Sequence, residues 1–105
     1  GEKPTYTSLL HAYRQACDPG RCLKLLEEMR LNGDLPNEKS SYEAVRAAIA
    51  AGDGEAVSET VAYCFRHNVP ISRSSLNASL HLLMRLGSVE LAEDVIRFMR
   101  SAPNL

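Results

Sequence analysis

The chain has 105 residues and a net charge of −1, which is enough sequence for one domain and argues against a generally basic nucleic-acid protein. Its 45% hydrophobic and 24% charged content excludes a disordered composition, and no run of about 18 apolar residues could span a membrane. Leu and Ala dominate and Trp is absent, so we expect helices around an aliphatic core. Three cysteines, an odd number, argue against a disulfide framework.

Two amphipathic helices are predicted first, near residues 5–17 and 19–32. Each carries an apolar stripe with the spacing of one helical face. The two stripes are Tyr6, Leu10, Tyr13 and Ala16, and then Cys22, Leu25, Leu26 and Met29. Asp18 and Pro19 supply an N-cap and a proline at the first helical position, and Gly33 ends the second helix.

A second pair of helices is predicted near 39–51 and 54–67. The later helix of this pair repeats the spacing with Val57, Thr60, Val61 and Cys64. The earlier helix carries Tyr42, Val45 and Ile49, at an offset of 36 residues from Tyr6, Leu9 and Tyr13. This offset predicts a turn between the helices of the second pair that is one residue shorter than in the first. Ser40 and Glu43 predict a capping box.

A third pair is predicted near 73–86 and 88–102. Its stripes lie 70 residues after those of the first pair, at Leu76, Leu80, Leu83 and Leu86 and at Ala92, Val95, Ile96 and Met99. Gly87 ends one helix and Ser88 caps the next. Short turns within each pair require antiparallel helices.

The period of about 35 residues predicts an all-α fold, an α-solenoid or alpha-alpha superhelix of three helix-turn-helix repeats. We expect repeats at 3–37, at 38–72, which is degenerate, and at 73–105, which is incomplete at its end. Neither end shows the polar cap helix that usually closes such a stack, so we expect further repeats or other protein subunits to pack on the open ends.

The first repeat resembles the pentatricopeptide repeat (PPR) family in residues 5–10 (TYTSLL), 25–29 (LLEEM), Gly33 and 36–37 (PN). The third is similar to it in residues 86–93 (LGSVELAE) and 98–99 (FM). Tetratricopeptide repeats have a comparable length, but their Trp and Leu-Gly-x-x-Tyr signature are absent. The resemblance implies a right-handed solenoid whose first helices line a concave face that binds single-stranded RNA, one base per repeat.

The resemblance also implies base-recognition residues: the position after the aromatic of the first helix and the last residue of the repeat. These are Thr7 and Asn37 in the first repeat, a pair that prefers adenine in similar repeats. Asn77 in the third leans toward a pyrimidine, and its partner would lie beyond the chain. Glu43 and Ser72 in the second depart from the family's code. Each of these side chains could instead cap a helix or stay solvated, and Asn37 could be the N-cap of the next helix.

Charge is segregated between the two kinds of helix. The first helices of the three pairs have a net charge of +4, the second helices −1, and the ends and turns −4. Positive charge therefore concentrates in the helices that the resemblance assigns to RNA. The predicted phosphate-binding residues are Arg14, Lys39, Arg46, Arg73 and Arg85, with Glu43 as the one acid among them. Tyr6, Tyr13 and Tyr42 lie on core stripes, so we expect them to pack rather than to stack on bases.

Three function classes follow. The first is a single-stranded RNA-binding module in organelle RNA processing, stability or translation. The second is a protein-interaction scaffold in a large organelle assembly such as a mitochondrial ribosome. The third, an enzyme, has no support, because His11, His67 and His81 lack a catalytic constellation and no phosphate loop exists. Mitochondrion or plastid is implied by the resemblance alone, since the chain shows no targeting segment.

No cofactor is expected. One set of side chains has a spacing that could suggest a metal site. Cys17, Cys22, Cys64 and His67 have loosely zinc-like spacing. We favour the simpler reading that the thiols are ordinary, because Cys22 lies on a predicted buried stripe and a free cysteine is a common small core residue.

Overall fold

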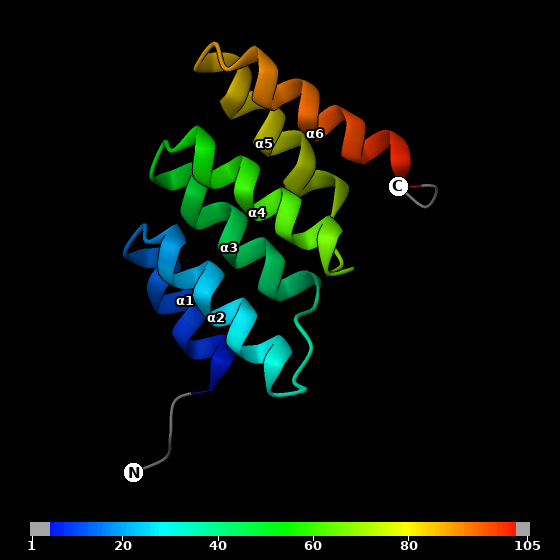
Figure 1. Cartoon of the computed structure of the whole chain (residues 1–105). Helices are drawn as coiled ribbons and strands as arrows, with labels where there is room; N and C mark the ends of the chain where they lie inside the picture. The colour runs from blue at the N-terminus through cyan, green and yellow to red at the C-terminus, as the bar shows by residue number, and fades with distance from the viewer. Residues whose placement is uncertain (1–4, 103–105) are drawn as a thin grey trace.

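The structure is a computed structural model that describes residues 5–102. The described chain is all-α, with six helices in three sequential pairs that pack like PPR helix-turn-helix repeats, as predicted (Figure 1). The predicted helix limits agree to within two residues. The ends of the first and third predicted repeats, at 3–4 and 103–105, lie outside the described residues. The helices are α1 (Tyr6–Gln15), α2 (Pro19–Leu31), α3 (Glu38–Ala50), α4 (Gly54–Arg66), α5 (Arg73–Arg85) and α6 (Val89–Ser101).

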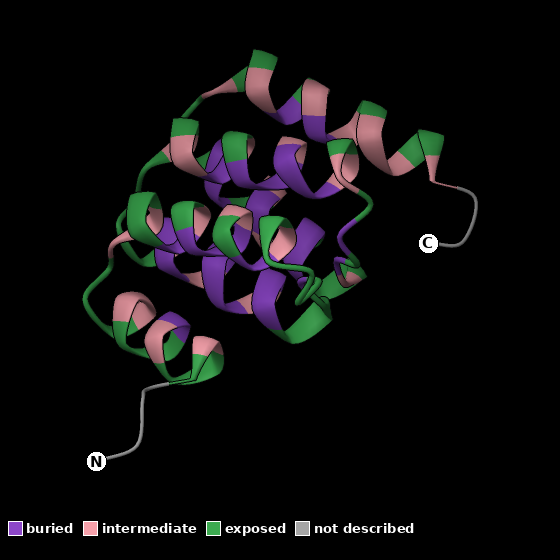
Figure 2. Ribbon diagram, turned by 60° about the horizontal axis from the view of Figure 1, so that its bottom comes forward, coloured by how far each residue is buried: buried purple, intermediate pink, exposed green. Residues whose placement is uncertain are grey.

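The helices form two layers, with the first helix of each pair in one layer and the second in the other. In Figure 1, α2, α4 and α6 lie in front, and α1, α3 and α5 lie behind them. We call these the B layer and the A layer. Figure 2 shows the buried residues gathered between the layers. The largest fully buried side chains include Leu10, Leu26, Val45, Val61, Leu76, Leu83 and Val95.

The predicted stripes account for most of this core, but some stripe residues lie outside it. Cys22, Leu25, Leu26 and Met29 are all buried, as the spacing in α2 predicts. Ala16 and Leu86 are exposed instead, because they are the C-cap residues of α1 and α5 and lie past the last buried turn.

The three turns inside the helix pairs have the same length and similar backbone conformations. Each holds one residue with positive φ: Cys17 at 53°, Gly52 at 64° and Gly87 at 71°. These residues are spaced 35 apart, and each turn places three residues between its helices. The predicted 36-residue offset and shortened second turn are therefore wrong. The true equivalents of Tyr6, Leu9 and Tyr13 in α3 are the small residues Ser41, Ala44 and Ala48, all fully buried.

The observed helix caps agree only in part with those predicted from the sequence. Asp18 is the N-cap of α2, and its carboxylate accepts a hydrogen bond from the Arg21 backbone N–H at 3.2 Å. The capping box of α3 joins Asn37 and Ser40 rather than Ser40 and Glu43, because the helix begins earlier, at Glu38. Ser88 occupies the N-cap position of α6 as predicted, but its side chain makes no capping hydrogen bond.

The outward side of α6 is charged rather than apolar. On α4, Ala62 and Phe65 face α6, where Phe65 stacks on Phe98 with ring centroids 5.0 Å apart. The residues 35 positions later on α6 are Arg97 and Arg100, both exposed. The α6 positions equivalent to the α6-facing residues of α4 are therefore charged. Exposed large apolar side chains lie around the α5–α6 turn, at Met84, Leu86 and Val89, and at and after the end of α2, at Leu31 and Leu35.

Candidate nucleic-acid interface

The 35-residue register places Tyr42, not Glu43, at the position equivalent to Thr7 and Asn77. Thr7 and Asn77 are exposed on α1 and α5, and Tyr42 is partly buried on α3. Thr7 is exposed, and its hydroxyl can both donate to and accept from a ligand. The sequence carries the signal for this register only in the turns, where Gly52 and Gly87 match each other and Cys17 does not look like their equivalent.

Asn37 and Ser72 are N-caps, the alternative that the sequence left open. The Asn37 Oδ1 accepts hydrogen bonds from the Ser40 backbone N–H at 2.9 Å and from the Ser40 hydroxyl at 3.0 Å. Ser72 Oγ accepts from the Ser75 backbone N–H at 3.0 Å. Asn37 is exposed, so its Nδ2 amide group remains available as a donor.

Glu43 is buried between α1 and α3 rather than displayed to solvent. Its side chain is 9% exposed, and its Oε2 lies 3.5 Å from Arg14 Nη1 and 3.7 Å from His11 Nδ1. A buried carboxylate needs such partners, because an isolated one would be strongly disfavoured. Glu43 therefore holds Arg14 and His11 in place and is poorly placed to meet a base.

Two cavities lie along the crevice between α1 and α3. The smaller, about 10 Å³, is lined by Thr7, Leu10, Asn37, Lys39, Ser40 and Glu43. This volume suits about one water molecule, so a base could contact only its rim. The larger, about 410 Å³, is lined by His11, Arg14, Gln15, Arg46, Ile49 and Ala50. Its lining contains two guanidinium groups and no carboxylate, and its volume falls in the range of ligand sites.

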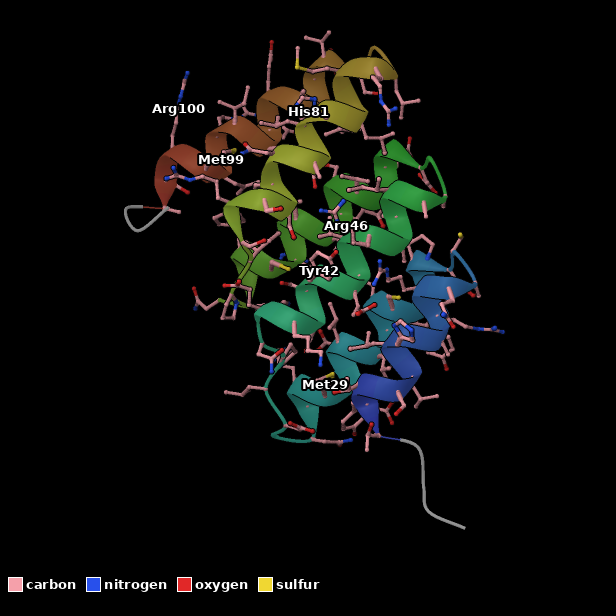
Figure 3. The ribbon with its side chains drawn as sticks, turned by 180° about the vertical axis from the view of Figure 1, so that it is seen from behind. Met29, Tyr42, Arg46, His81, Met99 and Arg100 are labelled. Atoms are coloured by element: carbon pink, nitrogen blue, oxygen red, sulfur yellow. The ribbon has the colours of Figure 1, made fainter. Side chains whose placement is uncertain are left out.

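Tyr42 lies beside both of these arginines. The guanidinium carbons of Arg14 and Arg46 lie 5.4 Å and 5.0 Å from the centre of its ring, distances typical of cation–π contacts. Figure 3 shows Tyr42 and Arg46 on α3, on the A-layer side of the molecule. The Nε of Arg46 is buried and has no hydrogen-bond partner in the described part of the chain. The expectation that Tyr42 packs in the core is therefore wrong, since it lies outside the hydrophobic cluster.

The remaining predicted phosphate-binding residues do not converge on this groove. Lys39 lies in the first turn of α3, and Arg73 and Arg85 mark opposite ends of α5, all exposed. The A-layer helices hold five Arg and Lys residues against Glu38 and Glu43, because α3 includes Glu38. Their net charge is +3 rather than the expected +4. The layer remains the basic one, since the B-layer helices hold six basic and seven acidic residues.

Two of the three cysteines are core residues. Cys22 and Cys64 are fully buried, and burial raises the pKa of their thiols to about 11 and about 12, so both are protonated at neutral pH. Cys17 is exposed in the α1–α2 turn. Among residues 5–102, no group of three or more His, Cys, Asp or Glu side chains could hold a metal ion. None of the described helices is long and apolar enough to cross a membrane.

The six helices in sequential pairs are arranged like one kind of helical repeat. Residues 4–34, which contain α1 and α2, match the family of the PPR repeat. This match covers the first helical hairpin and less than half of the chain. No curated protein and no solved structure matches the chain. A PPR repeat implies an RNA-binding helical repeat of a typically non-catalytic kind.

Proposed function

We propose that this chain binds single-stranded RNA along its A layer, in the service of organelle RNA processing, stability or translation. The PPR match of the first hairpin supports an RNA partner, and we extend the repeats to 38–72 and 73–105 because the second and third hairpins share its register. PPR proteins are commonly organellar, so a mitochondrial or plastid RNA is the expected partner.

The observation that carries this proposal is the groove between α1 and α3. Its cavity of about 410 Å³ is lined by Arg14, Arg46 and His11. Arg14 and His11 lie beside the buried Glu43 carboxylate, whereas Arg46 makes no ion pair within the described residues. Arginine is suited to phosphate because its planar fork donates several hydrogen bonds at once. The buried Nε of Arg46, which lacks a partner in the described chain, is a donor that a phosphate oxygen would satisfy.

Base recognition is proposed at the exposed A-layer positions. At the rim of the small cavity, Thr7 offers a hydroxyl and Asn37 offers its Nδ2 donor, since capping occupies its Oδ1. A donor and a hydroxyl together suit the adjacent acceptor and amino group of adenine. Asn77 is exposed at the equivalent position of α5 and is proposed to contact a pyrimidine.

The test is fluorescence anisotropy of labelled A-rich, U-rich and C-rich octanucleotides from low to physiological salt. We expect log affinity to fall with log salt with a slope of about −0.7 per phosphate contact. Replacing Arg46 and Arg85 by Gln should flatten the slope by about 1.4, which corresponds to two lost contacts. The matched control replaces Lys24 and Arg100, which are exposed on the B layer, and so removes the same charge. Absence of binding at low salt, or an equal loss in the control, would overturn the proposal.

A second candidate is a protein-interaction scaffold in a large organelle assembly. The observation that favours it is the exposed apolar group at the α5–α6 turn, where Met84, Leu86 and Val89 are 71%, 50% and 62% exposed. Apolar side chains gathered at one place are typical of protein-binding surfaces. Its test is whether a Met84→Ser, Leu86→Ser and Val89→Ser variant loses a partner in pull-downs from organelle extract while RNA affinity is unchanged.

A further inference from the structure

We propose that the second hairpin contacts RNA without recognising its base, because Tyr42 with Arg14 and Arg46 forms a stacking site that accepts any nucleotide. The inference rests on the proposed function and concerns a residue that the sequence assigned to the core. Its basis is the juxtaposition of three planar groups at the α1–α3 crevice.

The position of Tyr42 follows from the backbone. Tyr42 lies 35 residues after Thr7 and 35 before Asn77, and the positive-φ residues Cys17, Gly52 and Gly87 fix that register. Thr7 and Asn77 can exchange hydrogen bonds with a base edge, since each carries a group that accepts as well as donates. Tyr42 also has a hydroxyl, but most of its side chain is a ring, and a ring face has no hydrogen-bond pattern to match against one base.

The surroundings of Tyr42 suit stacking better than hydrogen bonding. Its ring is partly buried and is flanked by the guanidinium groups of Arg14 and Arg46, 5.4 Å and 5.0 Å from its centre. Bases stack on aromatic rings and on guanidinium planes, and every base offers a face for this. A single-stranded chain can therefore place any base on this cluster while its phosphate meets the adjoining groove.

Glu43 holds Arg14 in its position beside Tyr42. Its buried carboxylate lies 3.5 Å from Arg14 Nη1, and it lines the small cavity while its partners Arg14 and His11 line the large one. Arg14 is thus held between the ring of Tyr42 and the carboxylate of Glu43. Glu43 acts as a positioning residue for the cluster and has no direct role toward the base.

The predicted consequence is a gapped RNA motif. Thr7 with Asn37 should select one base, Asn77 should select another, and the nucleotide between them should be free to vary. A motif of this form does not depend on which way the RNA runs along the helices. Selection from a randomised octanucleotide library, followed by sequencing, measures it directly.

Three variants of Tyr42 test the inference. Tyr42→Phe keeps the ring and should bind RNA within about twofold of the unmodified protein. Tyr42→Ala should weaken binding to all homopolymers alike, by about tenfold, which is the usual scale for one lost base stack. Tyr42→Asn replaces the ring by an amide, which both donates and accepts, and should give the middle nucleotide a base preference. Thermal melts of all three establish that the fold is retained.

Two results would overturn the inference alone: a base preference at the middle nucleotide in the unmodified protein, or a folded Tyr42→Ala variant with unchanged affinity. A protein that binds no RNA in any of these assays would instead remove the proposed function itself, and this inference with it. Selective loss in Tyr42→Ala with retention in Tyr42→Phe supports the inference.

Discussion

At equivalent positions of α1 and α3, the first hairpin carries Thr7 and Ser8, and the second carries Tyr42 and Glu43. The backbones around them match, with the same three-residue turn and the same positive-φ residue before the next helix. The side chains differ because α1 exposes Ser8, whereas Glu43 on α3 lies against His11 and Arg14 of α1. One scaffold thus provides an exposed hydroxyl in one hairpin, and in the next a ring beside Arg14 and a buried carboxylate that pairs with it.

The largest expected effect is on the free energy of unfolding, when equivalent core residues of the first two hairpins are truncated. Leu26 in α2 and Val61 in α4 are equivalent and fully buried. Leu26→Ala should lower the free energy of unfolding by about 3 kcal/mol, since it removes three buried carbons and leaves a cavity. Val61→Ala removes two carbons and should cost less. Urea unfolding measures both, and Leu31→Ala, at a 70% exposed site on α2, is the control. A Leu26→Ala cost near that of the control would contradict the shared core.

A smaller effect on stability is expected at the ion pair between Arg14 of the first hairpin and Glu43 of the second. Arg14→Ala should lower the free energy of unfolding by about 1–2 kcal/mol, because the buried Glu43 carboxylate loses a charged partner. The cost is moderate since Arg14 is 35% exposed and solvent already screens it. Adding Glu43→Gln to Arg14→Ala should recover about half of the loss in the same urea assay. If the two substitutions are additive, the pair does not interact as described.

The smallest effect concerns the turn that the hairpins share. Cys17 adopts φ of 53°, a conformation that costs a side chain about 1 kcal/mol and costs glycine little. Cys17→Gly should therefore raise the melting temperature by about 4–8 °C, and Gly52→Ala should lower it by a similar amount. No atom lies within 4 Å of a Cβ built at Gly52, so the loss would come from the backbone alone. Shifts of the same sign in both variants would contradict the equivalence of the turns.

The sequence predicted the elements well because their limits are encoded locally. Asp18 with Pro19, Gly33 and Gly87 each end or begin a helix for reasons that a short segment contains. The helix pairs and their antiparallel packing then follow from short turns and apolar stripes. The residues of the B-layer stripes were accordingly placed correctly.

The register of α3 could not be predicted from its stripe. This helix is packed by small residues, and Ala44, Ala47 and Ala48 are fully buried among its neighbours. Because the buried face of such a helix consists of small residues, it does not stand out in the sequence as a stripe of large apolar side chains. Tyr42, Val45 and Ile49 have the spacing of the α1 stripe, and the sequence therefore predicts them as its equivalent. The turn residues indicate the true register. It is not evident in the sequence because the first turn has Cys17 where the other two have glycine. The partnership of Glu43 with Arg14 joins residues 29 apart in sequence, which no local pattern reveals.

The most direct test of the proposal that the A layer binds RNA is a titration of the isotope-labelled protein with single-stranded RNA, in which amide chemical shifts are measured at each step. The A layer should respond, with the largest changes near Thr7, Tyr42 and Asn77 and around the Arg14–Arg46 groove. Amides near Lys24 and Arg100 on the B layer should stay unchanged. Changes confined to the B layer or to the α5–α6 turn, or no changes at all, would contradict the account.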